Sequence, residues 1–342
     1  MSEKILQKEK WPNFVQALAD ARELWLPTED GPLHKFAPYD QEGQGTQAQA
    51  VESYTNSAIP PKTAAFPQTE TMFCFRLGEE ELELPQEDQG KVLLGVRPCD
   101  ARALEIVDNL FEWEENDPYY WDRREKTILV GLACNEPFLN CFCTSLEGSP
   151  GSTQGLDVLM VDLGESYFLK GVTEKGEKLL QEVGNTLEDA SGEGKEADRI
   201  VKEAESKIIR KVDVEKIPEK LPHLWDAPLW DQVSRACLGC GACTFLCPTC
   251  HCFDIQDEVE GYDGRRCRMW DSCMFSEYTL HASGHNPRPS RQDRTRNRIN
   301  HKYNYYVQKF DKIACVGCGR CITNCPVNID ILDILSRVKE EL

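Results

Sequence analysis

Cys237-Leu-Gly-Cys240-Gly-Ala-Cys243-Thr-Phe-Leu-Cys247-Pro248 is the stretch that decides the fold. Its spacing is C-x2-C-x2-C-x3-C-P, and the same spacing recurs from Cys315 to Pro326. Such a run is typical of two-cluster bacterial ferredoxins, in which three thiolates of a run hold one 4Fe-4S cubane and the fourth ligates the other cluster. The repeat therefore predicts two clusters with crossed ligand sets.

On this rule, the first three cysteines of each run share a cluster with the last cysteine of the other run. Paired C-x2-C motifs also build structural zinc sites, so a zinc-held interaction module is an alternative. A run of four cysteines that ends in Cys-Pro and occurs twice favours iron and sulfur over zinc. The predicted sets are Cys237, Cys240, Cys243 and Cys325 for cluster 1, and Cys315, Cys318, Cys321 and Cys247 for cluster 2.

Upstream of these runs, short apolar segments at residues 91–96, 126–131 and 155–161 predict buried strands. Residues 100–111 carry apolar side chains at helical spacing, and Asp100 is the expected N-cap. This alternation is typical of a βαβ-like α/β region.

Four more cysteines, Cys99, Cys134, Cys141 and Cys143, follow two of these predicted strands. Loops that leave the same edge of a parallel sheet converge, so the four thiolates could hold a third 4Fe-4S cluster. A set of ordinary buried thiols fits the same spacing equally well.

The predicted fold class is α+β, with two domains. We expect an N-terminal α/β domain over residues 1–230, which includes a segment at 171–222 that is rich in Lys, Glu and Gly and predicts two solvated helices. A two-cluster, bacterial-ferredoxin-like helical domain then covers residues 231–342, with a long basic insertion at about 253–312.

The basic insertion is unusual in so acidic a chain. Residues 262–312 contain eleven Lys and Arg and five Asp and Glu, whereas the whole chain has a net charge of −19. Because cubanes with four thiolates are anionic, charge compensation or internal docking is favoured over a substrate site. The residues concerned are His281, His285, Arg288, Arg291, Arg294, Arg296 and Arg298.

The remaining cysteines are less informative. Cys250, His251, Cys252 and Cys273 could ligate a metal, but packing or shielding of a cluster is favoured. Cys74 and Cys267 stand alone in the sequence, and a structural thiol is the default for each.

Composition excludes several other classes of protein. The 342 residues are 40% hydrophobic, which is enough for packed cores, and the net charge of −19 argues against a nucleic-acid or anionic-membrane partner. No stretch approaches the roughly 18 apolar residues of a membrane span, and the first ten residues lack an apolar signal segment. Seventeen cysteines, an odd number, fit a reducing cytoplasm better than a disulfide framework.

Along nearly its whole length the chain resembles an iron-sulfur subunit family. This family contains the β subunit of cytoplasmic nickel-iron sulfhydrogenases and the corresponding iron-sulfur subunit of anaerobic sulfite reductase. Arg97-Pro98 and Thr144-Ser145 resemble the sulfite-reductase version more closely. The resemblance rests on residues 95–100, 123–125, 141–143, 155–157, 237–252, 270–273, 284–286, Arg294, 296–298 and 315–326.

This resemblance implies an electron-transfer subunit with no catalytic residues of its own. It would lie beside a flavin-containing, NAD(P)H-oxidising subunit of ferredoxin-reductase type and pass electrons to a separate catalytic subunit. That subunit would be of hydrogenase, sulfite reductase or heterodisulfide-reductase type. The resemblance also favours the third cluster. A stand-alone iron-sulfur oxidoreductase is the alternative function.

Overall fold

The computed structural model describes residues 2–30, 33–40, 51, 54–85 and 89–341. Its larger sheet has the order β10-β1-β9-β8-β7-β6-β2-β3. Strands β2, β6, β7 and β8 pair in parallel, and the strands at both ends of the sheet pair antiparallel. The strands are β1 Glu3–Gln7, β2 Glu23–Asp30, β3 Leu33–Pro38, β6 Lys91–Val96, β7 Ile128–Leu132, β8 Val158–Asp162, β9 Ser166–Gly171 and β10 Glu188–Asp189.

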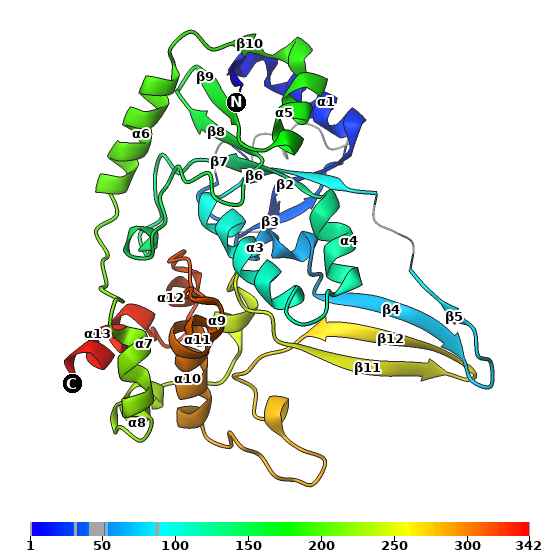
Figure 1. Ribbon diagram of the computed structural model, residues 1–342, viewed down its shortest axis with the longest axis vertical. Coiled ribbons are helices and arrows are strands. Elements are labelled where there is room, and N and C mark those ends of the chain that lie inside the picture. The colour runs from blue at the N-terminus through cyan, green and yellow to red at the C-terminus, as the bar shows by residue number, and fades with distance from the viewer. Residues whose placement is uncertain (1, 31–32, 41–50, 52–53, 86–88, 342) are drawn as a thin grey trace.

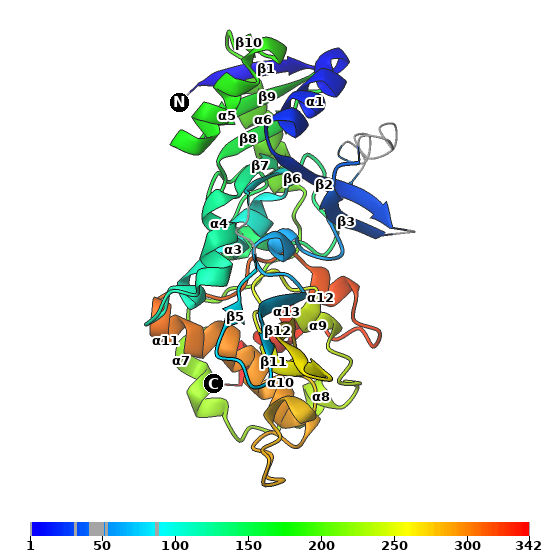
Figure 2. The same cartoon turned by 90° about the vertical axis from the view of Figure 1, so that its right-hand side faces the viewer.

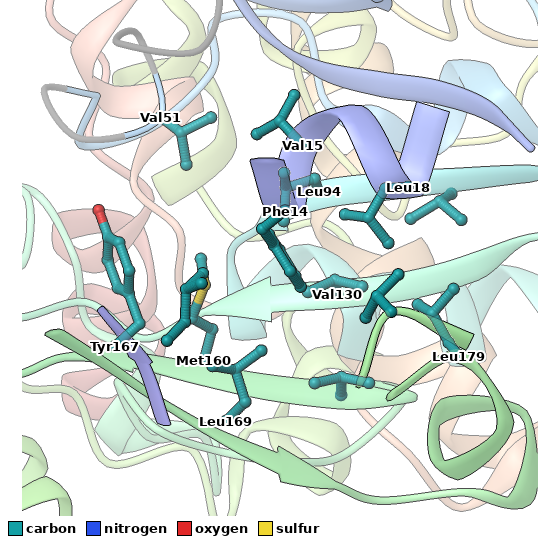
Figure 3. Packing of buried hydrophobic residues seen from close by; sticks show 14 of the residues in the cluster. Phe14, Val15, Leu18, Val51, Leu94, Val130, Met160, Tyr167, Leu169 and Leu179 are labelled. Carbon is teal, nitrogen blue, oxygen red and sulfur yellow. The ribbon is translucent and has the colours of Figure 1, made fainter. Parts of the chain in front are cut away.

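Helices cover both faces of this sheet. Alternate strand residues point to opposite sides, and β6 and β7 are buried at every position, so both faces carry apolar side chains to be covered. On one face, α1 and α5 pack on Leu94, Val130 and Met160, as Figure 3 shows. On the other face, α3 and α6 pack on Leu93 and Leu129. These helices and the neighbouring α4 are α1 Trp11–Ala21, α3 Pro98–Phe111, α4 Pro118–Lys126, α5 Glu174–Glu182 and α6 Gly194–Ser206.

The predicted βαβ pattern is confirmed in its main elements. The strand expected at 91–96 is β6, and the two later strands, β7 and β8, lie one to three residues downstream of their predicted bounds. The expected role of Asp100 as N-cap is wrong: α3 begins at Pro98 with Arg97 as its N-cap. Asp100 lies instead within the first helical turn, where its carboxylate binds a buried arginine.

A second sheet joins segments that are far apart in the sequence. Its order is β11-β12-β4-β5, and all of its pairings are antiparallel. It projects to one side of the molecule in Figure 1. Because β4 comes from the N-terminal part and β12 from the insertion, the sheet includes strands from both sides of the domain boundary predicted near residue 230. The boundary itself stays a prediction. The strands are β4 Thr69–Arg76, β5 Leu82–Glu83, β11 Phe253–Glu260 and β12 Asp263–Trp270.

Short helices form the other end of the molecule (Figures 1 and 2). Trp230, Tyr303 and Leu335 are among the residues of their core, and Phe142 from the N-terminal part joins them. The α-helices are α7 Ile217–Lys220, α8 Leu229–Ser234, α9 Ala242–Phe245, α10 Arg291–Asn300, α11 Tyr306–Phe310, α12 Arg320–Thr323 and α13 Ile331–Glu340. A π turn at His301–Tyr305 joins α10 to α11. The 3-10 turns are Lys8–Lys10, Pro61–Ala64, Cys143–Ser145, Gly184–Thr186, Leu221–Leu224 and Glu277–Thr279.

A buried ion pair connects the two ends of the molecule. Arg320 donates two hydrogen bonds to the Asp100 carboxylate, at 2.6 and 2.8 Å, and the two side chains are 3% and 0% exposed. The same guanidinium also binds the Ser57 carbonyl oxygen at 2.7 Å and the Asn56 side chain. Three separate parts of the chain therefore meet at Arg320.

We predict that Asp100→Asn destabilises the protein by about 3–5 kcal/mol, because it leaves the Arg320 charge buried without a counterion. The matched control is Asp333→Asn, which removes an exposed pair with Arg337 and should cost less than about 1 kcal/mol. Anaerobic thermal unfolding of both variants is the measurement. A similar loss of stability in the two variants would show that the buried pair contributes no more to stability than the exposed pair.

Candidate iron-sulfur centres

The two cysteine runs have the same backbone. In the first run, Gly239 and Gly241 have φ of 70° and 75°, and in the second, Gly317 and Gly319 have φ of 68° and 75°. Each pair of glycines leads into a helix of four residues, α9 or α12, which is followed by the last cysteine of the run. The repeat seen in the sequence is therefore a structural repeat, and α9 and α12 contact each other.

The cysteines predicted for cluster 1 surround one cavity of about 60 Å³. Its lining contains Cys237, Cys240 and Cys243 from the first run and Cys325 from the second, together with Cys321, which was predicted for cluster 2. Backbone N–H groups point at two of these sulfurs, from Gly239 to Cys237 Sγ at 3.4 Å and from Ile329 to Cys325 Sγ at 3.2 Å. The four predicted thiols around one cavity, with amides directed at two of the sulfurs, fit the chemistry of a cubane.

The cysteines predicted for cluster 2 also gather. Cys321 interacts electrostatically with Cys247, Cys315 and Cys318, so the last cysteine of the first run lies among the first three of the second. Burial raises the pKa of Cys318 to about 11 and that of Cys321 to about 12. This placement agrees with the crossed ligand sets that the sequence predicts. The ligand sets themselves stay a prediction.

The third set converges as the parallel strands predict. Cys99 follows β6, Cys134 follows β7, and Cys141 and Cys143 lie in the loop after β7. The thiols of Cys99, Cys141 and Cys143 all interact with Cys134, and all three also interact with Cys318. Burial raises the pKa of Cys143 to about 12. The third set is therefore adjacent to the second, at Cys318.

Within the described ranges, no group of three or more His, Cys, Asp or Glu side chains is arranged to hold a metal ion.

Close backbone contact fixes the third set against the second run. Phe142 N–H donates to the Gly317 carbonyl oxygen at 2.8 Å. A Cβ on Gly317 would lie 2.6 Å from the backbone nitrogen of Cys143, and one on Gly319 would lie 2.4 Å from the Asn140 carbonyl oxygen. No side chain fits at either glycine unless the two loops separate.

Buried cations lie beside the candidate ligands. Lys302 Nζ is 3.3 Å from Cys247 Sγ, and Arg298 donates to the Cys243 carbonyl oxygen at 2.9 Å. Both side chains are buried, and the nearby cysteines raise the pKa of Lys302 against the opposing effect of burial. Charge compensation was expected for the basic insertion, and these two residues are placed to supply it.

The other singled-out residues of the insertion have different contacts. Arg294 binds the carbonyl oxygens of Arg288 and Pro289, while the Arg296 guanidinium lies 4.0 Å from the Trp225 ring centroid. His281, His285 and Arg291 are exposed. Sequence reasoning missed Lys302, Lys62 and Arg320, whose partners are distant in the sequence.

The remaining thiols lie near the centres or in the second sheet. Cys250 contacts Cys247, and Cys252 accepts a hydrogen bond from Cys273, which lowers the pKa of Cys252 to about 6. The His251 ring is 5.2 Å from that of His301, and burial lowers the pKa of His251 to about 3. Cys74 and Cys267 lie on β4 and β12.

These features define a class of protein, one that carries a 4Fe-4S dicluster domain. The family model of the 4Fe-4S dicluster domain matches residues 236–329, which include both cysteine runs and the insertion. No helix in the part of the chain that the structure describes has the length and apolar character to cross a membrane.

The chain is also 32% identical, over 342 residues, to sulfhydrogenase 2 subunit beta of Pyrococcus furiosus, and the match covers 98% of each chain. It therefore belongs to the iron-sulfur subunit family of sulfhydrogenase beta subunits. No solved structure matches the chain.

We predict that Gly317→Ala destabilises the protein by about 2–5 kcal/mol, from a left-handed alanine and from overlap with Cys143. Gly261→Ala is the matched control. Gly261 has a φ of 64°, and a Cβ added there would meet no atom within 4 Å beyond its chain neighbours, so strain alone should cost about 1–2 kcal/mol. Anaerobic thermal unfolding and iron content are the measurements. Equal losses in the two variants would contradict a tight contact at Gly317.

Proposed function

We propose that this chain is the electron-relay subunit of a multi-subunit oxidoreductase in the cytoplasm. It passes electrons between a flavin- and NAD(P)H-binding subunit of ferredoxin-reductase type and a separate catalytic subunit of hydrogenase, sulfite reductase or heterodisulfide-reductase type. Membership of a family that includes a sulfhydrogenase beta subunit supports the hydrogenase-type setting. The residues supply two 4Fe-4S sites and a third site of the same kind.

The observation that carries the proposal is that each thiol set adjoins the next. The third set adjoins the second at Cys318, and the second adjoins the first through Cys247 and Cys321. The first set reaches the surface, because Cys240 is exposed and Leu238 beside it is 60% exposed. Clusters held in this order would form a path from the edge of the large sheet to the surface at Cys240.

The thiol sets do not line the large cavity of the second sheet. That cavity, of about 870 Å³, is lined by β4, β5, β11 and β12 and includes Glu79, Glu81 and Glu258. None of the twelve candidate ligands is in its lining. This separation favours a relay over an enzyme that turns over a small substrate at one of its own clusters.

We expect about twelve irons per chain in the anaerobically purified protein, four for each cubane. The double variant Cys134→Ser/Cys141→Ser should retain about eight irons and the visible absorption of the two ferredoxin-type clusters. The control Cys74→Ser/Cys267→Ser removes two thiols of the second sheet and should retain the full iron content. About eight irons in the unmodified chain would contradict the third cluster, and a colourless chain without labile sulfide would contradict the relay.

The partners are tested by anaerobic purification of the chain from its native host, with mass-spectrometric identification of what stays bound. Recovery with a flavin subunit and a hydrogenase, sulfite reductase or heterodisulfide-reductase-like subunit is the expected result. Recovery of an iron-loaded monomer would contradict the multi-subunit assignment.

An exposed-surface variant, Leu238→Glu, should lower electron transfer to the partner that docks at cluster 1 while iron content is unchanged.

A further inference from the structure

Cys252 and Cys273 form a pair of thiols that the candidate clusters do not use. Cys252 immediately precedes β11, and Cys273 follows the end of β12 by three residues. The hairpin pairs Phe253 with Trp270, and Asp271 N–H donates to the Cys252 carbonyl oxygen at 2.9 Å. This pairing brings the two residues together: they pack in one side-chain cluster, they line one cavity, and the Cys273 thiol interacts electrostatically with Cys252.

The space around this pair is small. The cavity that contains both thiols has a volume of about 10 Å³, and its lining also includes Cys250, His251 and His301. A cavity needs about 10–15 Å³ to hold one water molecule, so there is no room for a cubane. The cavity among the cluster 1 thiols is about 60 Å³. Cys252 and Cys273 therefore share a cavity that is much smaller than the cavity at cluster 1.

The pair packs against the candidate ligands of cluster 1. Cys273 shares a buried cluster of side chains with Cys237 and Met274, and both Cys252 and Cys243 are packed against this group. An electron that leaves the thiol pair therefore has a short path to cluster 1.

We propose that Cys252 and Cys273 are a redox-active dithiol that exchanges two electrons with the iron-sulfur clusters, an inference that rests on the proposed relay function. On oxidation, the two S–H bonds break and one S–S bond forms, which releases two protons and two electrons. The clusters that the candidate ligands would hold supply the acceptors, because each 4Fe-4S cluster can take up one electron. The reverse step takes two electrons from reduced clusters and two protons from the surroundings, and it restores the thiols.

Two neighbouring side chains suit this chemistry. The half-buried Tyr278 packs in the same side-chain cluster as Cys252 and interacts electrostatically with it. Lys62 is buried close by, with its Nζ 4.0 Å from the Trp270 ring centroid, and its charge acts favourably on a Cys252 thiolate. The pair would thus store two electrons beside carriers that each take one.

The first experiment maps the pair in the unmodified full-length protein, loaded with its clusters under anaerobic conditions. Samples oxidised with thionine or reduced with dithionite are denatured in N-ethylmaleimide and analysed by peptide mass spectrometry. We expect a Cys252–Cys273 disulfide in the oxidised sample and alkylation of both residues in the reduced one. Alkylation of both residues in the two samples would overturn the proposal, and this test requires no variant to fold.

The second experiment counts electrons in the double variant Cys252→Ser/Cys273→Ser. Anaerobic dithionite titration should show two electrons fewer per chain than the unmodified protein, with iron and labile sulfide unchanged. The control Cys74→Ser/Cys267→Ser should lose none. An unchanged electron count overturns the dithiol, and a loss of iron confined to the Cys252/Cys273 variant does so as well, because it assigns these residues to metal binding.

The two proposals fail in different ways. A chain without labile sulfide contradicts the relay itself, whatever the state of the thiol pair. A chain with its full labile sulfide but no Cys252–Cys273 disulfide after oxidation contradicts the dithiol alone.

Discussion

The buried ion pair between Arg320 and Asp100 is the interaction on which the arrangement of the thiol sets depends. Arg320 lies between Cys318 and Cys321 of the second run, and Asp100 directly follows Cys99 of the third set. Burial of two charges is costly, and the cost is offset here because the guanidinium has a carboxylate and further oxygens as partners. The pair fixes the position of one ligand set relative to the next, so its contribution is to geometry as much as to stability.

Charge explains why cations are buried in a chain with a net charge of −19. A cubane with four thiolates is anionic, and its charge is unfavourable in an interior from which water is excluded. Lys302 and Arg298 lie at the first run, while Arg97 donates to carbonyl oxygens beside Cys134. Buried cations are therefore found beside the candidate ligands although the chain as a whole is acidic.

Sequence reasoning predicted the parts of the site that depend on short-range spacing. The two runs are recognisable because three ligands of each predicted cubane lie within a few residues of one another. The third set follows from the rule that parallel strands β6 and β7 end at the same edge. The pairing of β4 with β12 and the partners of Lys62 and Arg320 were not predictable. They join residues that lie nearly 200 or more positions apart, and no local pattern encodes such contacts.

The carboxyl edge of a parallel sheet is where α/β proteins generally bind their ligands, because loops from neighbouring strands converge there. In this chain the converging loops after β6 and β7 present thiols, and they pack directly on the second cysteine run at Gly317. The α/β part is thus more than a support for the dicluster domain. It supplies the candidate ligands of one end of the proposed path, and the absence of side chains at Gly317 and Gly319 is what lets the two cysteine-bearing loops approach closely enough to continue it.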